Sequence, residues 1–424
     1  MILRTLLLTL AALLIWTAFV VTGTLEGWWR RPLAPFGDTK AFQAAAIADI
    51  DKTNIGNVAF ALIANGRVAA THFVSAGKPV DGDSRFQVAS MSKWITAWGV
   101  MTLVEAGKLD LDKPVSVYLK RWTLPKSKFD NAGITVRRLL SHTAGLTDGL
   151  GYAGFKPGAP LQSLEASLTR AADASPGAAG NVQVGIEPGT EFKYSGGGYT
   201  LLQLLIEEVS GQSFNDYMTA HILAPLGMSR STFVLDESAA TDVAEFFDES
   251  GAPATHYRFT ALAAASLYTT TNDMTRFLQA HLAGPNGEAP GRGVLSAKTL
   301  LEMRRPHASR FGVDIWGLGT ILYAPNKAGG FVIGHDGNNE PAINTAARLD
   351  PATGDGIVIL ETGNHLLATA LAGEWVFWHT GKVDLLTLAM EWRTLLTMLA
   401  AGWAAIILAA LFFGWRLRRV YSTR

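Results

Sequence analysis

A serine and a lysine three residues apart carry the clearest chemical signal in this 424-residue chain. Ser90 and Lys93 lie in the stretch 88–107, where apolar side chains recur at helical spacing until Gly107 provides a C-terminal stop. On a helix, positions i and i+3 lie one turn apart on the same face, so the amine would lie beside the hydroxyl. Burial lowers the pKa of an amine and allows it to accept the serine proton. The pattern therefore predicts a serine nucleophile in the first turn of a core helix, where backbone N–H groups could stabilise an oxyanion.

A second Ser-x-x-Lys pair, Ser75 with Lys78, provides an internal comparison. Gly77 and Pro79 flank this lysine, and no helix can carry it beneath the serine. Short motifs of this kind also arise by chance. We interpret the Ser75 pair as a chance match and Ser90 as the reactive serine.

Composition excludes several kinds of chemistry. The 36 basic and 36 acidic residues cancel, so nothing indicates a nucleic-acid partner. The absence of cysteine excludes disulfides, thiolate metal sites and a cysteine nucleophile. The nine histidines show no H-x-x-x-H or H-E-x-x-H spacing, so we predict no metal and no other cofactor. A lipase of the α/β-hydrolase class is disfavoured because no G-x-S-x-G motif is present.

Two uncharged apolar runs lie near the ends of the chain, at residues 5–23 and 395–415. Each is long enough to cross a bilayer. A cleaved signal peptide is the alternative for the first run, but its apolar part exceeds the usual signal core and no clear Ala-x-Ala site follows. We therefore expect an N-terminal membrane anchor at 1–24 and a C-terminal transmembrane helix at 394–415.

The charges beside these runs predict their orientation. The tail, residues 416–424, carries four arginines, so the positive-inside rule places it in the cytoplasm. Two spans then put the N-terminus inside as well and residues 25–393 outside. Arg30 and Arg31 oppose this orientation mildly, but four arginines outweigh two. Residues 25–40, with two tryptophans and two prolines, are interpreted as a juxtamembrane linker.

The region between the two spans has strand signals at both ends and helix signals in the middle. Apolar runs at 57–64 and 67–75 flank Asn65-Gly66, a strong hairpin signal. Further strands are expected at 317–323, 331–334, 342–349 and 356–361, and helices at 42–53, 137–140, 161–172, 199–209, 214–222 and 274–282. This order predicts an α+β fold, an antiparallel sheet flanked by helices with an inserted helical domain.

We expect residues 41–385 to form one domain, with the sheet drawn from 41–89 and 310–365 and the helical part from 90–309. Residues 150–190, rich in Gly, Ala and Pro, are predicted to form a lid over the site.

Two further motifs complete a set with Ser90 and Lys93. Tyr194-Ser195-Gly196 opens a Gly-rich bend before a helix, and His335-Asp336-Gly337 lies at the predicted end of a short strand. In order and rough spacing the three motifs match those of the serine β-lactamase and penicillin-binding-protein fold. More closely, the chain resembles the class C β-lactamase-related serine hydrolases, which include D-alanyl-D-alanine carboxypeptidases and esterases. The resemblance covers about residues 40–380 and rests on VASMSKWITA, GKLDLDKPVSVYL, ITVRRLLSHTAGL, EPGTEFKYSGGGYTLLQLLIE, LGMSRSTF, NDMTRFLQ and GHDGNN.

The resemblance implies a role for each motif. Ser90 would be the acylated nucleophile, and Lys93 would tune it and share protons. Tyr194 would be the general base for Ser90 and the acid for the leaving group, helped by a neighbouring ammonium that lowers its pKa.

The third motif would contribute to substrate binding through His335 and Gly337. The strand backbone near Asn338 would supply one oxyanion N–H, and Ser90 the other. We interpret His142 as structural, because its neighbours form a helix-ending turn whose local backbone the imidazole would cap.

Two positions depart from the β-lactamase pattern. Gly196 stands where those enzymes have an asparagine, and it cannot donate a side-chain hydrogen bond to the substrate amide. His335 stands where they usually have a lysine, and a neutral imidazole attracts a substrate carboxylate less strongly. Both changes weaken β-lactam recognition and leave acyl-enzyme chemistry intact.

We therefore expect a membrane-anchored serine hydrolase that acts on an ester, amide or β-lactam carbonyl of a small molecule or peptide. Its catalytic domain would lie on the periplasmic face of a bacterial inner membrane. One alternative is a catalytically inactive protein that binds peptidoglycan or a lipid headgroup. The other is a true class C-type β-lactamase.

Overall fold

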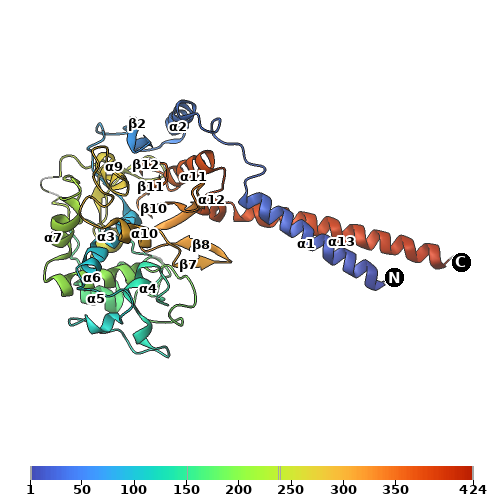
Figure 1. Ribbon diagram of the computed structural model, residues 1–424, viewed down its shortest axis with the longest axis horizontal. Coiled ribbons are helices and arrows are strands. Elements are labelled where there is room, and N and C mark those ends of the chain that lie inside the picture. The colour runs from blue at the N-terminus through green and yellow to red at the C-terminus, as the bar shows by residue number, and fades with distance from the viewer. Residues whose placement is uncertain (1, 150, 237, 239, 423–424) are drawn as a thin grey trace.

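The computed structural model describes residues 2–149, 151–236, 238 and 240–422. An eight-stranded antiparallel sheet lies among helices, and the two terminal helices project together from one side of this domain (Figure 1). The strands of the sheet come from two segments far apart in the sequence, 58–74 and 308–362, and helices dominate the chain between them. The predicted α+β fold with an inserted helical part is confirmed.

The sheet has the order β2-β1-β12-β11-β10-β9-β8-β7. Its strands are β1 (Val58–Ala64), β2 (Arg67–Val74), β7 (Ala308–Arg310), β8 (Val313–Trp316), β9 (Ile321–Pro325), β10 (Phe331–Asn339), β11 (Ile343–Asp350) and β12 (Asp355–Thr362). The predicted hairpin between β1 and β2 is confirmed, and both turn residues have positive φ, 49° at Asn65 and 75° at Gly66, as a tight hairpin turn requires.

Two strand predictions need correction. The expected strand at 317–323 begins only at Ile321, because Gly317 to Thr320 form the turn between β8 and β9. β10 continues to Asn339, so the His-Asp-Gly motif lies inside a strand rather than at its end. The edge hairpin of β7 and β8 was not expected, because its residues are mostly polar or exposed and lack alternation.

Helices cover both faces of the sheet, so its central strands are buried on both sides. One face packs against α2 (Thr39–Thr53) and α11 (Leu367–Thr380). The other face packs against α3 (Ser92–Glu105) and α9 (Thr271–Ala280), and beyond them lie the helices of the inserted part: α4 (Val136–Leu140), α5 (Leu164–Arg170), α6 (Gly196–Ser210), α7 (Phe214–Met218), α8 (Leu262–Ala265) and α10 (Ala297–Met303). The sequence did not predict α11, because its apolar side chains lie on all sides of the helix instead of forming one stripe.

The predicted helix at 88–107 is divided in two. Ala89–Met91 form a short 3-10 turn, and α3 starts at Ser92. Ser90 therefore lies in the turn that precedes the core helix, not in the first turn of the helix itself.

The terminal helices α1 (Ile2–Leu25) and α13 (Trp392–Ser422) pack side by side (Figure 1). Both are long and apolar enough to cross a membrane, and most of their side chains are exposed, unlike those of a core helix. Two hydrogen bonds join them: the Trp16 indole donates to the Met398 carbonyl at 3.2 Å, and the Trp403 indole to the Thr17 hydroxyl at 3.0 Å.

The linker after α1 is attached to the domain by ion pairs. Arg30 forms ion pairs with Glu374 on α11 and with Glu391, which lies just before α13. Its guanidinium is 2.7 Å from the Glu391 carboxylate. Val383, which follows α11 and precedes α12 (Leu385–Met390), lies against the end of α1. Because two carboxylates compensate its charge, Arg30 carries less weight against the predicted orientation than a free arginine would.

Candidate active site

Ser90 and Lys93 lie in contact at the start of α3. The Lys93 Nζ donates to the Ser90 Oγ at 3.0 Å and to the Ala264 carbonyl at 2.7 Å. Lys93 is 1 % exposed, and burial lowers the pKa of its amine to about 7, although the charge of Asp148 opposes this shift. A lysine in this state has a large neutral fraction near neutral pH and can accept a proton from the adjacent alcohol.

The backbone around Ser90 is tightly constrained. Ala89 has φ of +45°, a conformation that a residue with a side chain rarely adopts and that costs about 1–3 kcal/mol. A Cβ atom at Gly337 would lie 2.0 Å from the Val88 carbonyl oxygen. Gly337 therefore allows β10 to approach the segment that carries the serine, and no larger residue would fit.

The strand edge beside Ser90 offers backbone donors. Gly334 directs its N–H and carbonyl toward Thr320. The Thr320 hydroxyl donates to the Gly334 carbonyl at 3.0 Å and accepts a hydrogen bond from the Gly334 N–H at 3.1 Å. In an antiparallel strand every second residue directs these groups to the same edge, so Asn338 directs its N–H to that edge too. The pairing of β10 with β9 ends at Gly334, and the following part of this edge faces the turn that holds Ser90.

Tyr194 precedes α6 and lies beside both residues of the first motif. Its ring centroid is 5.1 Å from the Lys93 Nζ, and the Ser90 hydroxyl acts as a hydrogen-bond partner of the phenol. Burial raises the pKa of Tyr194, and the contact with Ser90 offsets only part of the shift. The expectation of a lowered pKa is therefore wrong: burial keeps the phenol protonated.

His335 also faces this side of the sheet. Its Nδ1 donates to the Asp336 carbonyl at 2.6 Å, and its Nε2 is buried without a partner among the described residues. Burial, together with the charge of Lys93, lowers the pKa of His335 to about 3. The imidazole is neutral, so the third motif supplies no ammonium to act on Tyr194.

His142 contacts the second motif, and its predicted local capping role is corrected. Its ring stacks on Tyr194 with the centroids 4.3 Å apart, and its Nδ1 accepts the Ser195 N–H at 3.1 Å. The imidazole thus caps a backbone group 53 residues away in the chain. A local sequence pattern could not indicate this contact.

Asp148 is a site residue that the sequence did not reveal. Its buried carboxylate accepts hydrogen bonds from the Ser195 hydroxyl and, at 2.7 Å, from the Gly197 N–H. It also acts electrostatically on Lys93. The residue lies in a Gly-rich loop with no periodicity, so only the folded chain brings it to the start of α6.

A cavity of 170 Å³ opens beside Ser90. It is lined by Ala89, Ser90, Lys93, Gly151, Tyr152, Ser175, Ala264, Ala265, Asn338 and Asn339. Gly151, Tyr152 and Ser175 come from the segment predicted to form a lid, which here forms a wall of the cavity. Gly196 is buried behind this wall, since a Cβ atom there would lie 3.0 Å from the Tyr152 ring.

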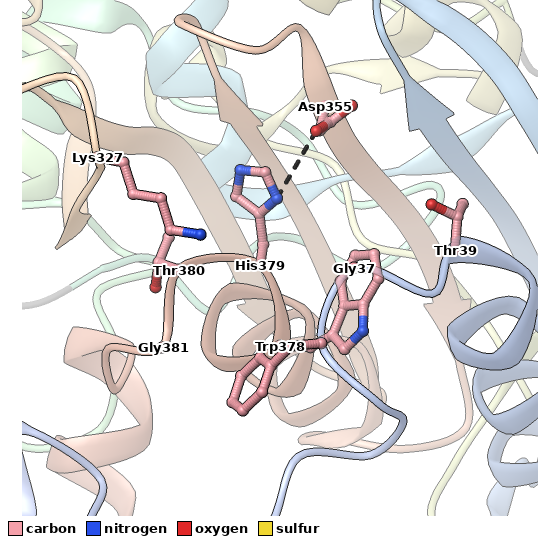
Figure 2. Close-up of a pocket in the computed structure, with 9 residues that line it drawn as sticks. Gly37, Thr39, Lys327, Asp355, Trp378, His379, Thr380 and Gly381 are labelled. Carbon is pink, nitrogen blue, oxygen red and sulfur yellow. Dashed lines mark ion pairs between the residues drawn. The ribbon is translucent and has the colours of Figure 1, made fainter.

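A larger hollow of 440 Å³ lies at the C-terminal end of α11, and none of the three motifs contributes to it (Figure 2). Its His379 pairs with Asp350 at 2.9 Å and lies 3.7 Å from Asp355. Within the described part of the chain, no three His, Asp or Glu side chains are grouped to hold a metal ion. The cavity beside Ser90 is therefore the candidate active site, and its groups suit nucleophilic attack on a carbonyl.

Known proteins resemble this chain over most of its length. A family model described as beta-lactamase matches residues 42–376. The chain is 31% identical over 300 residues to penicillin-binding protein 4 of Amycolatopsis lactamdurans, an alignment that covers 68% of this chain and 74% of that protein.

Two solved structures share the fold. The octameric penicillin-binding protein homologue from Pyrococcus abyssi superposes with a TM-score of 0.64 at 24% identity, covering 80% of this chain and 76% of that one. A beta-lactamase/D-alanine carboxypeptidase from Pseudomonas syringae gives a TM-score of 0.62 at 18% identity, with 79% and 97% covered.

Proposed function

The chain belongs to the beta-lactamase family, and from this premise we propose that it is a membrane-anchored serine hydrolase whose acyl-enzyme forms on Ser90. The observation that carries the proposal is the 3.0 Å contact between the Lys93 amine and the Ser90 hydroxyl. An amine with a pKa of about 7 at this distance is a competent base for the alcohol.

In the first step Lys93 accepts the Ser90 proton while the Ser90 Oγ attacks the carbonyl carbon of the substrate. Charge develops on the carbonyl oxygen, and the N–H groups of Ser90 and Asn338 stabilise it. The free edge of β10 supports this role for Asn338, because its N–H points toward the serine turn.

In the second step the tetrahedral intermediate collapses and the leaving group takes a proton. Tyr194 donates it and recovers one from the Lys93 ammonium, since its raised pKa keeps the phenol protonated. Water then attacks the acyl-enzyme and Lys93 accepts the water proton; as the bond between the acyl group and the Ser90 Oγ breaks, Lys93 returns that proton to the Oγ and the acid product leaves. Tyr194 thus acts as the acid, and Lys93 takes the role of base that the family resemblance would give to the tyrosine.

The charge of the site favours neutral substrates. His335 is neutral and Gly196 has no side chain, so neither attracts a carboxylate or binds an amide. An uncharged ester or amide is therefore a better substrate than a β-lactam, whose carboxylate would lack a cationic partner in the third motif. The contact between Ser90 and Lys93 also disfavours an inactive binding protein.

The two apolar terminal helices support membrane anchoring, with both termini in the cytoplasm and the catalytic domain on the periplasmic face of a bacterial inner membrane. The arginines after the second span favour this orientation.

The proposal is tested by turnover of three substrates, namely a nitrophenyl ester, a D-Ala-D-Ala peptide and a chromogenic cephalosporin, with the full chain in detergent. We expect the uncharged nitrophenyl ester to be hydrolysed faster than the peptide and the cephalosporin, both of which carry a carboxylate. Ser90→Ala should abolish turnover, and Ser75→Ala, the matched change in the chance Ser-x-x-Lys pair, should not. Full activity of Ser90→Ala would overturn the proposal, and turnover of the cephalosporin alone would overturn the preference for neutral substrates.

A further inference from the structure

The cavity beside Ser90 is small. Its 170 Å³ lies below the roughly 300–1,000 Å³ of pockets that enclose drug-sized ligands. Its lining includes the apolar Ala264 and Ala265 and the polar groups of Ser175, Asn338 and Asn339. Lys93 is the one basic or acidic side chain among the described lining residues apart from the Tyr152 phenol, and it is committed to Ser90.

Tyr152 lines the cavity and is held at three points. Its hydroxyl bonds the Thr200 hydroxyl on α6 at 2.6 Å. Its carbonyl accepts a hydrogen bond from the Asn339 side chain at 3.1 Å, which joins the segment after residue 150 to the end of β10. Its ring lies against Gly196. The ring is only 7 % exposed, so Tyr152 is a fixed wall of the site.

Tyr152 and Gly196 form a complementary pair. The position at which a Cβ of residue 196 would stand is 3.0 Å from the Tyr152 Cε2 and 3.4 Å from the Gly151 Cα. A contact of 3.0 Å is tighter than ordinary packing between carbon atoms, so a side chain at 196 requires the Tyr152 ring to give way by a few tenths of an ångström. The tyrosine ring thus occupies space that a larger side chain at position 196 would otherwise use.

The cavity lies on the acyl side of the scissile bond. Tyr194 and His335 do not line it. The leaving group must depart where Tyr194 can protonate it, and the acyl group then lies on the other side of Ser90. The neighbouring apolar pocket of 320 Å³ has no described lining residue in common with the cavity: Leu262 and Ser266 line the pocket, whereas Ala264 and Ala265 line the cavity.

We propose that Tyr152 sets the length of the acyl group and that the enzyme takes short, uncharged acyl esters or amides, of acetyl to butyryl size. This inference rests on the proposed hydrolase function of Ser90. A longer acyl chain meets the Tyr152 ring and cannot pass α8 into the apolar pocket. Truncation of the ring removes the barrier, and an added methyl group at 196 tightens it.

The test measures kcat/KM for nitrophenyl acetate, butyrate and hexanoate, with the full chain in one detergent at one concentration. The parent protein should prefer acetate or butyrate to hexanoate by roughly tenfold or more, the discrimination that one or two methylene groups give in a pocket of fixed shape. Tyr152→Ala should reduce this preference by a similar factor. Tyr152→Phe keeps the ring and is the matched control, so it should retain the parent profile.

Gly196→Ala provides an independent variant, should Tyr152→Ala fold poorly. It should lower the butyrate rate relative to the acetate rate, because the ring moves into the cavity. A flat chain-length profile in the parent, or an unchanged profile in both Tyr152→Ala and Gly196→Ala, would overturn the acyl-length inference alone. Absence of turnover of every ester by the parent would instead count against the proposed function.

Discussion

Asp336, the middle residue of the third motif, points away from Ser90 and forms an ion pair with Arg348 beneath α11. The Arg348 side chain is fully buried, and its Nε also bonds Asp384, the N-cap of α12, at 3.1 Å. The Tyr323 ring lies 3.4 Å from the guanidinium carbon and donates its hydroxyl to Asp336 at 2.7 Å. This network fixes the strand of the third motif to the helices that lead into α13.

Removal of the guanidinium should destabilise the domain strongly. Arg348→Leu leaves the buried Asp384 and the partly buried Asp336 without a cationic partner, and breaking a buried ion pair in this way costs about 3–5 kcal/mol. The free energy of unfolding, measured by denaturant titration of the full chain in detergent, should fall by this amount. Arg67→Leu, on the exposed face of β2, is the matched control and should change it by less than about 0.5 kcal/mol. Equal losses in the two variants would contradict the role of the network.

The pH dependence of the reaction should follow Lys93. The protonated ammonium cannot accept the Ser90 proton, so kcat/KM should fall as the pH drops through about 7, the pKa of Lys93. Lys93→Arg should lose activity by roughly 10²–10⁴-fold, because a guanidinium stays charged at every accessible pH. A pH–rate profile for ester hydrolysis checks both. A rate that is constant from pH 5 to 9, or a profile unchanged in Lys93→Arg, would assign the base elsewhere.

Glu361 should make the protein less stable as the pH rises. This buried carboxyl on β12 has one oxygen without a partner among the described residues, and burial raises the pKa of Glu361 to about 9. The unfolded chain releases this proton near pH 4.5, whereas the folded chain retains it, so stability declines between these two values. At pH 7 the cost is about 3 kcal/mol.

Glu361→Gln should therefore raise the melting temperature at pH 7 and leave it nearly unchanged at pH 4. Glu249→Gln, at an exposed position of the same residue type, controls for the loss of a surface charge. Scanning calorimetry at the two pH values separates the outcomes. A variant that is less stable than the parent at pH 7 would mean that the carboxyl is ionised and paired.

The absence of native cysteine makes the topology directly measurable. A single cysteine at the exposed Glu249 position should react with a membrane-impermeant maleimide on intact spheroplasts. A single cysteine at position 422, near the end of α13, should react only after the membrane is permeabilised. Labelling of position 422 in intact spheroplasts would reverse the proposed orientation.

Local pattern was enough to predict the features that depend on neighbours in the sequence. The β1–β2 hairpin follows from Asn65-Gly66, and the contact between Lys93 and Ser90 follows from a three-residue spacing before a helix. α11 was not predicted because its side chains are buried on all sides, so its sequence shows no single apolar stripe. Asp148 and Tyr152 escaped because loops far from the motifs bring them to the site through tertiary packing. The pKa of Tyr194 was predicted in the wrong direction, since it depends mainly on burial, which the local sequence does not show.

The identity of the nucleophile is tested most directly by locating the covalent adduct of a fluorophosphonate probe by tandem mass spectrometry of the digested full chain. A single adduct on Ser90, absent from Ser90→Ala and retained in Ser75→Ala, is the predicted result. An adduct on Ser75 or on any residue other than Ser90, or undiminished labelling of Ser90→Ala, would contradict the assignment of Ser90 as the acylated residue.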